Sequence, residues 1–167
     1  MAPWATAEYV RATGDSGVLD EEVRFLLGEP LGPEEEDRYR HWVPGGPPAS
    51  LYEHCLRALE HGSTAGVRGL PLIGAGDWND GMDRVGPAGK GESVWLGWFL
   101  LAVLWDFAGL CRARGDSAQA ALLEARAGVL RASLAEAWDG AWFLRGTYDD
   151  GSLLGSASRK EGRIDAV

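Results

Sequence analysis

Residues 94–110 read Val-Trp-Leu-Gly-Trp-Phe-Leu-Leu-Ala-Val-Leu-Trp-Asp-Phe-Ala-Gly-Leu, and only Asp106 among them carries a charge. Ser93 can accept a hydrogen bond from a backbone N–H of a first helical turn, so we predict a helix that begins after Ser93 and runs to about Arg114. A helix without a polar face is normally buried in a larger structure, and we expect this one to be enclosed, with its tryptophans in the core, although one of them could line a binding pocket. Its uninterrupted apolar run, residues 94–105, is too short to span a bilayer.

The next segment has a different pattern. Gly115 ends the apolar helix, Asp116 or Ser117 can cap another, and residues 119–138 place Arg, Glu and Ala on one side of an amphipathic helix. An enclosed helix followed by an amphipathic one is the pattern of an inner and outer pair in an (α/α) barrel. We therefore predict an all-α fold in which residues 93–138 form such a pair.

The rest of the chain is organised around shorter elements. We predict helices over residues 4–12, 19–27 and 51–60, the last capped by Ser50 with Glu53 in a capping box. Residues 28–49 are rich in Pro, Gly and Glu and are predicted as loop, as are the Gly-rich residues 62–92. Residues 141–154, around Asp149-Asp150-Gly151, indicate a small β-hairpin.

Composition limits the classes of partner. The 167 residues carry a formal charge of −9, which argues against nucleic acid or an anionic membrane as partner. Cys55 and Cys111 lack CxxC spacing and a nearby histidine pair, so we interpret both as buried thiols and expect neither a disulfide nor a zinc site. The first residues lack the pattern of a signal peptide, and we expect a cytoplasmic protein.

The segment that carries chemistry is the Gly-rich loop of residues 69–86. Within it, Gly76-Asp-Trp-Asn-Asp-Gly-Met-Asp83 packs three aspartates, one asparagine and one tryptophan between glycines. Glycines let a loop turn tightly and direct side chains at a bound molecule. A carboxylic acid beside an indole suits sugar chemistry, because the ring offers an apolar platform and lowers the local dielectric, so that the acid keeps its proton.

A calcium site and a purely structural turn are two other interpretations of this loop. A calcium-binding EF-hand would need Asp, Gly and Glu where Gly81, Met82 and Ala88 stand, so we expect no metal. A purely structural loop of Asx turns stays open on composition alone. Within the turn, Asp77 can fold back to accept backbone N–H groups, which lowers its pKa, whereas the residue before Gly81 can point outward and stay protonated.

Three stretches of the chain resemble glycoside hydrolase family 94, the inverting glycoside phosphorylases, and in particular the phosphorylase region of cyclic β-1,2-glucan synthases and β-1,2-oligoglucan phosphorylases. They are Gly-Asp-Trp-Asn-Asp-Gly-Met (76–82), Arg-Val-Gly (84–86) and Gly-Glu-Ser-Val-Trp-Leu-Gly-Trp-Phe-Leu (91–100). The resemblance implies part of an (α/α)6-barrel catalytic domain over residues 1–167. It also implies that a β-linked glucan is cleaved with inorganic phosphate as co-substrate, without a cofactor.

The resemblance assigns roles within the loop. It implies that Asp80 is the general acid that protonates the leaving oxygen while phosphate attacks the anomeric carbon with inversion. It places Trp78 beside the sugar, and we take Asp77, Asn79 and Arg84 as supporting substrate-binding residues. An (α/α)-barrel hydrolase that uses water stays an alternative, and would need a second carboxylate such as Glu92 or Asp83 as base.

The family also implies substrate-binding residues upstream and phosphate-binding residues downstream of these 167. We therefore interpret the chain as a central segment and expect it to be inactive alone. A non-catalytic module that binds carbohydrate or another subunit is the second alternative. The apolar surface left uncovered predicts self-association or contact with the rest of the barrel, and a membrane-tethered parent protein stays open.

Overall fold

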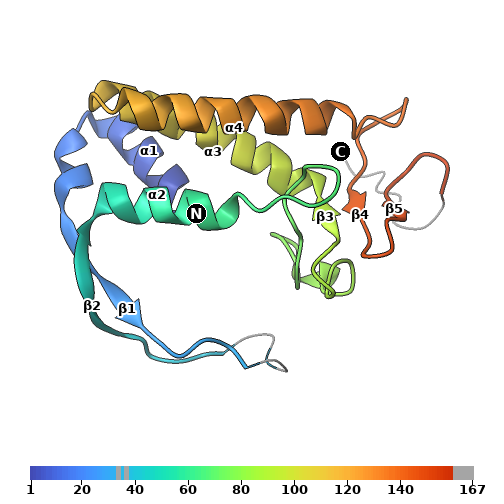
Figure 1. The fold of residues 1–167 in the computed structure, drawn as a ribbon, viewed down its shortest axis with the longest axis horizontal. Coiled ribbons are helices and arrows are strands. Elements are labelled where there is room, and N and C mark those ends of the chain that lie inside the picture. The colour runs from blue at the N-terminus through green and yellow to red at the C-terminus, as the bar shows by residue number, and fades with distance from the viewer. Residues whose placement is uncertain (33–34, 36–37, 160–167) are drawn as a thin grey trace. The chain divides into compact units, whose positions relative to one another are not determined.

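The computed structural model describes residues 1–32, 35 and 38–159, and of Asp80 only the backbone. The chain divides into two compact units, residues 1–59 and residues 60–167 (Figure 1). The prediction of a single partial domain over residues 1–167 stays a prediction. Helices dominate both units, as an all-α fold predicts, and two small antiparallel sheets accompany them, of which only the hairpin near the C-terminus was predicted.

The first unit holds a helix, a β-ribbon and most of a second helix. Its elements are α1 (Ala2–Thr13), the 3-10 helix η1 (Ser16–Asp20), β1 (Glu22–Leu27), β2 (Val43–Ser50) and α2 (Leu51–Gly62). The helices predicted over residues 4–12 and 51–60 are confirmed as α1 and α2. Helix α1 ends at Gly14, whose φ of 74° suits glycine, and the Ser50 hydroxyl caps α2 by accepting a hydrogen bond from the Glu53 N–H at 3.2 Å.

The helix predicted over residues 19–27 is wrong, and so is the loop predicted up to residue 49. Residues 22–27 form strand β1, which pairs antiparallel with β2. Strand β2 carries three prolines, which a two-stranded ribbon tolerates because each strand has an edge free of ladder bonds. The periodicity misled because this ribbon is largely exposed: Val23, Leu26 and Leu27 do not sort into an inner and an outer face.

The second unit is built on a pair of long helices, α3 (Val94–Ala113) and α4 (Ser117–Ala135), which pack along each other (Figure 1). Helix α4 buries about one residue per turn against this interface, and its charged residues lie outside that buried stripe, as predicted. Its buried residues are Ala120, Leu123, Ala127, Leu130 and Leu134. Gly97 allows the close approach, because a Cβ there would lie 2.9 Å from a methyl group of Leu134.

Helix α3 is not enclosed within this chain, contrary to expectation. It buries Leu104, Phe107 and Cys111 almost completely, yet its tryptophans Trp95 and Trp105 are 38% and 45% exposed. Helix α4 covers only one side of it, and a sequence that is apolar all round does not show which side is covered. The opposite side is the uncovered apolar surface that was predicted.

Helix α3 is also longer than residues 94–105, the apolar run that sequence analysis judged too short to span a bilayer. By length and composition alone it is long and apolar enough to cross a membrane, with 20 residues and a mean hydropathy of 1.8. In this structure 44% of that stretch is buried, and a core helix passes the same test. Length and hydropathy therefore assign no membrane span here.

Short strands join the start of α3 to the end of the chain. Strand β3 (Glu92–Ser93) pairs with β4 (Gly146–Thr147), which pairs with β5 (Leu153–Leu154). The predicted hairpin around Asp149-Asp150-Gly151 is thus confirmed, and β3 extends it to three strands. The Gly-rich residues 62–92 are mostly turns, with one 3-10 helix, η2 (Asp80–Met82). The three-stranded sheet therefore ties the end of the predicted acid loop, at β3, to the hairpin formed by β4 and β5.

Candidate active site in the Gly-rich loop

The base of the loop is closed by backbone hydrogen bonds. The Ser93 N–H donates to the Pro71 carbonyl and the Ile73 N–H to the Gly91 carbonyl, both at 2.9 Å. Gly91 has no room for a side chain, because a Cβ there would lie 2.8 Å from the Val85 carbonyl oxygen. The loop between these anchors is therefore fixed at its ends.

Asp149, on the hairpin, secures one side of the loop. Its carboxylate accepts backbone N–H groups from Ala88 and Lys90 at 2.8 Å and from Gly91 at 2.9 Å. The hydrogen bond from Ala88 contributes most to lowering the pKa of Asp149. This carboxylate acts on the loop as a structural anion.

Glu92 has a similar structural role, which bears on the hydrolase alternative. The residue is 2% exposed, and its carboxylate accepts the N–H of Leu70 at 3.0 Å and that of Arg68 at 3.1 Å. A buried carboxylate committed to backbone donors is poorly placed to activate water. Asp83, the other residue named as a base, is exposed at the end of η2.

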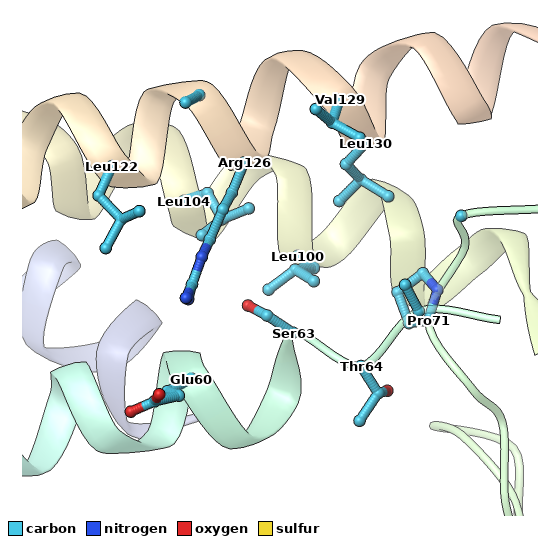
Figure 2. A pocket seen from close by; sticks show the side chains of 13 residues that line it. Glu60, Ser63, Thr64, Pro71, Leu100, Leu104, Leu122, Arg126, Val129 and Leu130 are labelled. Atoms are coloured by element: carbon cyan, nitrogen blue, oxygen red, sulfur yellow. The ribbon is translucent and has the colours of Figure 1, made fainter.

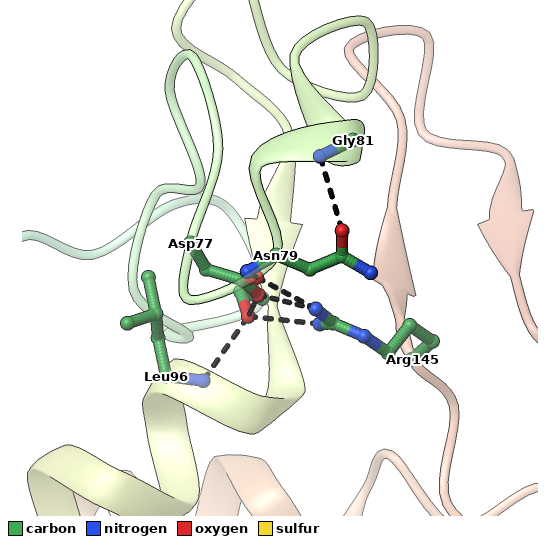
Figure 3. Close-up of polar contacts among 6 residues, drawn as sticks. Asp77, Asn79, Gly81, Leu96 and Arg145 are labelled. Carbon is green, nitrogen blue, oxygen red and sulfur yellow. Dashed lines mark hydrogen bonds and ion pairs between the residues drawn. The ribbon is translucent and has the colours of Figure 1, made fainter. Parts of the chain in front are cut away.

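Asp77 lies at the centre of a buried network (Figure 3). Its side chain is fully buried, and its two oxygens lie 2.7 and 2.6 Å from one guanidinium nitrogen of Arg145, whose side chain is 11% exposed. The Ser93 hydroxyl donates to Asp77 Oδ2 at 2.7 Å, and the Asn79 N–H donates to Oδ1 at 3.0 Å. The last bond is the Asx turn predicted from sequence.

This network decides the charge of Asp77. Burial acts to raise its pKa, but the hydrogen bonds from Arg145, Asn79 and Ser93 outweigh burial and hold the pKa below its ordinary value. Asp77 is therefore a carboxylate at neutral pH. It has no proton to donate to a leaving group, and its buried oxygens are already occupied by protein donors.

Asn79 continues the network toward Asp80. Its side-chain oxygen accepts the Gly81 N–H at 3.0 Å and so caps η2 (Figure 3). The backbone of Asp80 thus lies between two residues that are fixed by hydrogen bonds. The side chain of Asp80 lies outside the described part of the structure, so its predicted role as acid stays a prediction.

Trp78 is the exposed member of the loop. It is 62% exposed, and its ring centroid lies 5.7 Å from that of Trp95, which in turn stacks on Phe99 at 5.6 Å. Trp95 therefore packs against the Trp78 ring at an angle of 48°, while most of the Trp78 surface stays accessible. An exposed ring on a fixed loop is suited to a sugar face.

Arg84 lies elsewhere than expected. It lines an open hollow of about 520 Å³ together with Tyr148, Asp150 and Arg159 of the hairpin region. No contact between Arg84 and Asp77, Trp78 or Asn79 is found among the described residues. The structure brings Asp77, Trp78 and Asn79 together and gives no support to Arg84 as their partner.

A second pocket, of about 380 Å³, lies between residues 63–71 and the two long helices (Figure 2). Leu100, Leu104 and Leu130 give it an apolar wall, and Arg126 reaches into it from α4. Of the site residues predicted from sequence whose side chains the structure describes, none lines this pocket.

Comparison with known proteins identifies the family. A family model described as the catalytic domain of the glycosyl hydrolase 94 superfamily matches residues 3–167. The chain belongs to the glycosyl hydrolase 94 superfamily. The Gly-Asp-Trp-Asn-Asp loop described above thus lies inside the matched catalytic domain of a glycosyl hydrolase 94 protein.

Curated relatives of this glycosyl hydrolase 94 chain are much longer than it is. It is 45% identical over 165 residues to a cyclic beta-(1,2)-glucan synthase of Rhizobium meliloti (strain 1021), across 98% of this chain and 6% of that protein. It is 34% identical over 167 residues to solabiose phosphorylase of Paenibacillus borealis, across 98% and 19%. It is 34% identical over 164 residues to cellobionic acid phosphorylase of Neurospora crassa, across 97% and 18%.

Arg145 is the site residue that sequence analysis missed. It lies 68 positions from Asp77, immediately before β4, and nothing in the local pattern links the two. The only signal was the hairpin itself, since a hairpin that pairs with β3 must bring its first strand beside the start of α3.

Ser93 provides a first test of the network in this glycosyl hydrolase 94 chain. Its hydroxyl caps α3 by accepting the Leu96 N–H at 3.1 Å and also donates to Asp77. We expect Ser93→Ala to lower the free energy of unfolding by about 1–2 kcal/mol in urea denaturation, because a cap and a charged hydrogen bond are both lost. Ser117→Ala, at an exposed position at the start of α4, is the control and should change it by less than about 0.5 kcal/mol. Equal effects of the two substitutions would contradict the network.

Proposed function

We propose that the chain is the acid-loop segment of an inverting β-glucan phosphorylase, with Asp80 as general acid and inorganic phosphate as nucleophile. The observation that carries this proposal is the buried ion pair between Asp77 and Arg145. It commits Asp77 to structure, and of the two carboxyls that flank Trp78 and Asn79 this leaves Asp80 for proton transfer.

The proposed reaction needs one protein carboxyl. Phosphate attacks the anomeric carbon as the bond to the glycosidic oxygen breaks, and the Asp80 carboxylic acid gives its proton to that oxygen. Phosphate is already anionic and needs no protein base, so neither Glu92 nor Asp83 is required. Trp78 offers an apolar surface to the sugar, and Asn79 holds the turn that carries Asp80.

The relatives support the chemical class of the substrate. Several are named as phosphorylases, including those for solabiose and cellobionic acid, and one is named as a cyclic beta-(1,2)-glucan synthase. We take β-1,2-linked glucan as the substrate because the synthase shares 45% of aligned residues with this chain.

We further propose that α3 and α4 are an inner and outer helix pair of an (α/α)6 barrel, whose other helices cover the exposed tryptophan side of α3. On this view the segment works only within the complete domain, as the relatives' lengths suggest. A cytoplasmic location is part of the same proposal.

Phosphate dependence tests this function. The full-length protein that contains this segment is incubated with β-1,2-glucan, with and without inorganic phosphate, and glucose 1-phosphate and free glucose are measured. The proposal expects glucose 1-phosphate only when phosphate is present. Release of free reducing sugar at the same rate without phosphate would instead support the hydrolase.

A non-catalytic carbohydrate-binding module is the second candidate, favoured by the exposure of Trp78. It predicts glucan binding with no turnover under the same conditions. Binding with neither phosphorolysis nor hydrolysis in the full-length protein would therefore replace the first proposal by this one.

Both candidates predict that Trp78 contributes to sugar binding. Covering roughly 50–60 Å² of ring at about 25 cal/mol per Å² gives ~1.4 kcal/mol, which is about tenfold in affinity. We expect Trp78→Ala to raise the Kd for a β-1,2-gluco-oligosaccharide about tenfold in calorimetric titration of the full-length protein. Trp4→Ala, at a 40% exposed tryptophan of α1, is the control and should leave Kd unchanged. A Kd unchanged by Trp78→Ala would remove the ring from the binding site.

A further inference from the structure

Arg145 is anchored independently of the acid loop. Its N–H donates to the Leu154 carbonyl at 2.9 Å, and its own carbonyl accepts the Val94 N–H at 3.2 Å. The backbone of Arg145 is thus fixed to strand β5 on one side and to the first residue of α3 on the other. Its guanidinium therefore extends toward the loop from a rigid support.

A continuous series of contacts leads from this support to the acid. Arg145 holds both oxygens of Asp77, Asp77 holds the N–H of Asn79, and Asn79 holds the N–H of Gly81 (Figure 3). These contacts fix the backbone on both sides of Asp80. Arg145 also donates to the Ser93 hydroxyl at 3.2 Å, so the N-terminus of α3 belongs to the same network.

We propose that Arg145 is a positioning residue for proton donation by Asp80, so that the hairpin at residues 146–154 sets the orientation of the acid loop. This inference rests on the proposed function, because it presumes that Asp80 is the acid. In this proposal Arg145 acts on the acid through Asp77 and Asn79. A misplacement of about 1 Å in a reacting group can lower a rate about 10²-fold, so loss of this support should be visible in catalysis.

The readout must separate positioning from loss of folded protein. A smaller folded fraction lowers turnover of every substrate by the same factor. A displaced acid lowers turnover mainly where the leaving group needs a proton, as in a β-glucan, and much less with β-glucosyl fluoride. The ratio of the two losses therefore reports on the position of the acid.

The experiment uses the full-length enzyme, with kcat measured on β-1,2-glucan and on β-glucosyl fluoride at saturating phosphate. We expect Arg145→Gln to lower kcat on the glucan about 10–100-fold. The fold-loss in kcat on the fluoride should be at least tenfold smaller. Asp77→Asn should give the same pattern. The double variant should be no worse than the more impaired single variant, because both act through one contact.

Two further variants complete the design. Arg145→Lys keeps the charge without the planar guanidinium, and it should also lose more activity on the glucan than on the fluoride, by a smaller ratio. If Arg145→Gln does not fold, this variant tests the positioning role in its place. Arg112→Gln removes an exposed ion pair to Glu124 between α3 and α4 and should leave the ratio unchanged. Equal losses on both substrates in the Arg145 variants, or additive losses in the double variant, would overturn the inference.

Asp80→Asn separates this inference from the proposed function. If that variant fails to distinguish the two substrates, Asp80 is not the acid and the proposed function falls together with the inference. If Asp80→Asn distinguishes them and the Arg145 variants do not, the function stands and only the positioning role of Arg145 is overturned.

Discussion

Asp80→Asn in the complete enzyme is expected to lower phosphorolysis of an unactivated β-glucan by roughly 10²–10⁴-fold, the usual effect of losing a general acid. Asparagine keeps the size of the side chain and can still follow Asn79 into η2, so the loop should keep its shape. The missing proton, and not a distorted loop, then accounts for the loss. The measurement is kcat on β-1,2-glucan at saturating phosphate.

Turnover of β-glucosyl fluoride provides the control for this prediction. Fluoride leaves without protonation, so Asp80→Asn should retain most activity on that substrate. Comparable losses on both substrates would mean that Asp80 holds the loop and does not donate the proton. Near-normal activity of Asp80→Asn together with an inactive Asp77→Asn would transfer the role to Asp77.

Asp77→Ala is expected to lower the free energy of unfolding by about 3–5 kcal/mol. The substitution leaves the guanidinium of Arg145, 11% exposed, without the carboxylate that it holds, and an uncompensated buried charge is strongly destabilising. Urea denaturation of the chain measures the change. Glu124→Ala breaks the more exposed pair with Arg112 and is the matched control, with an expected loss below about 1 kcal/mol. A loss below about 1 kcal/mol for Asp77→Ala as well would contradict a structural role for this pair.

The same carboxylate predicts a dependence of stability on pH. The pKa of Asp77 is lowered in the folded chain, whereas in the unfolded chain it is about 3.9. The unfolded state therefore binds the proton first as pH falls. The contribution of Asp77 is complete well above pH ~3.9 and is lost as pH falls through the lower folded-state pKa. Asp77→Asn should flatten this part of the curve of unfolding free energy against pH, and an unchanged slope would contradict the assignment.

The parts of the fold that could be predicted are those fixed by local chemistry. Ser50, Ser93 and Asp116 each cap the helix that their position indicated, and Gly14 ends α1. The buried stripe of α4 follows from its spacing alone. Strand β1 was missed because its ribbon stays exposed, so no inward and outward alternation marks it. An uncovered apolar surface was predicted, but which side of α3 forms it could not be, because the helix is apolar on every side.

In the candidate site too, contacts between residues close in sequence could be predicted and contacts between distant residues could not. The Asx turn of Asp77 depends on residues two apart, and sequence analysis identified it. The partner that fixes its charge, Arg145, comes from the hairpin 68 residues later, and only the pairing of β3 with β4 brings it near. Arg84 was selected together with the loop motif, but it lines the hollow beside the hairpin, and its role in substrate binding stays a prediction.

The configuration of the first product tests the central claim, a single displacement by phosphate with one protein carboxyl. Proton NMR of the products of β-1,2-glucan and phosphate turnover by the full-length protein distinguishes the two anomers of glucose 1-phosphate, which do not interconvert because the anomeric oxygen carries the phosphate. The account predicts the α anomer, since direct attack by phosphate inverts the β-linked carbon. The β anomer would require a second carboxylate as nucleophile and would contradict it.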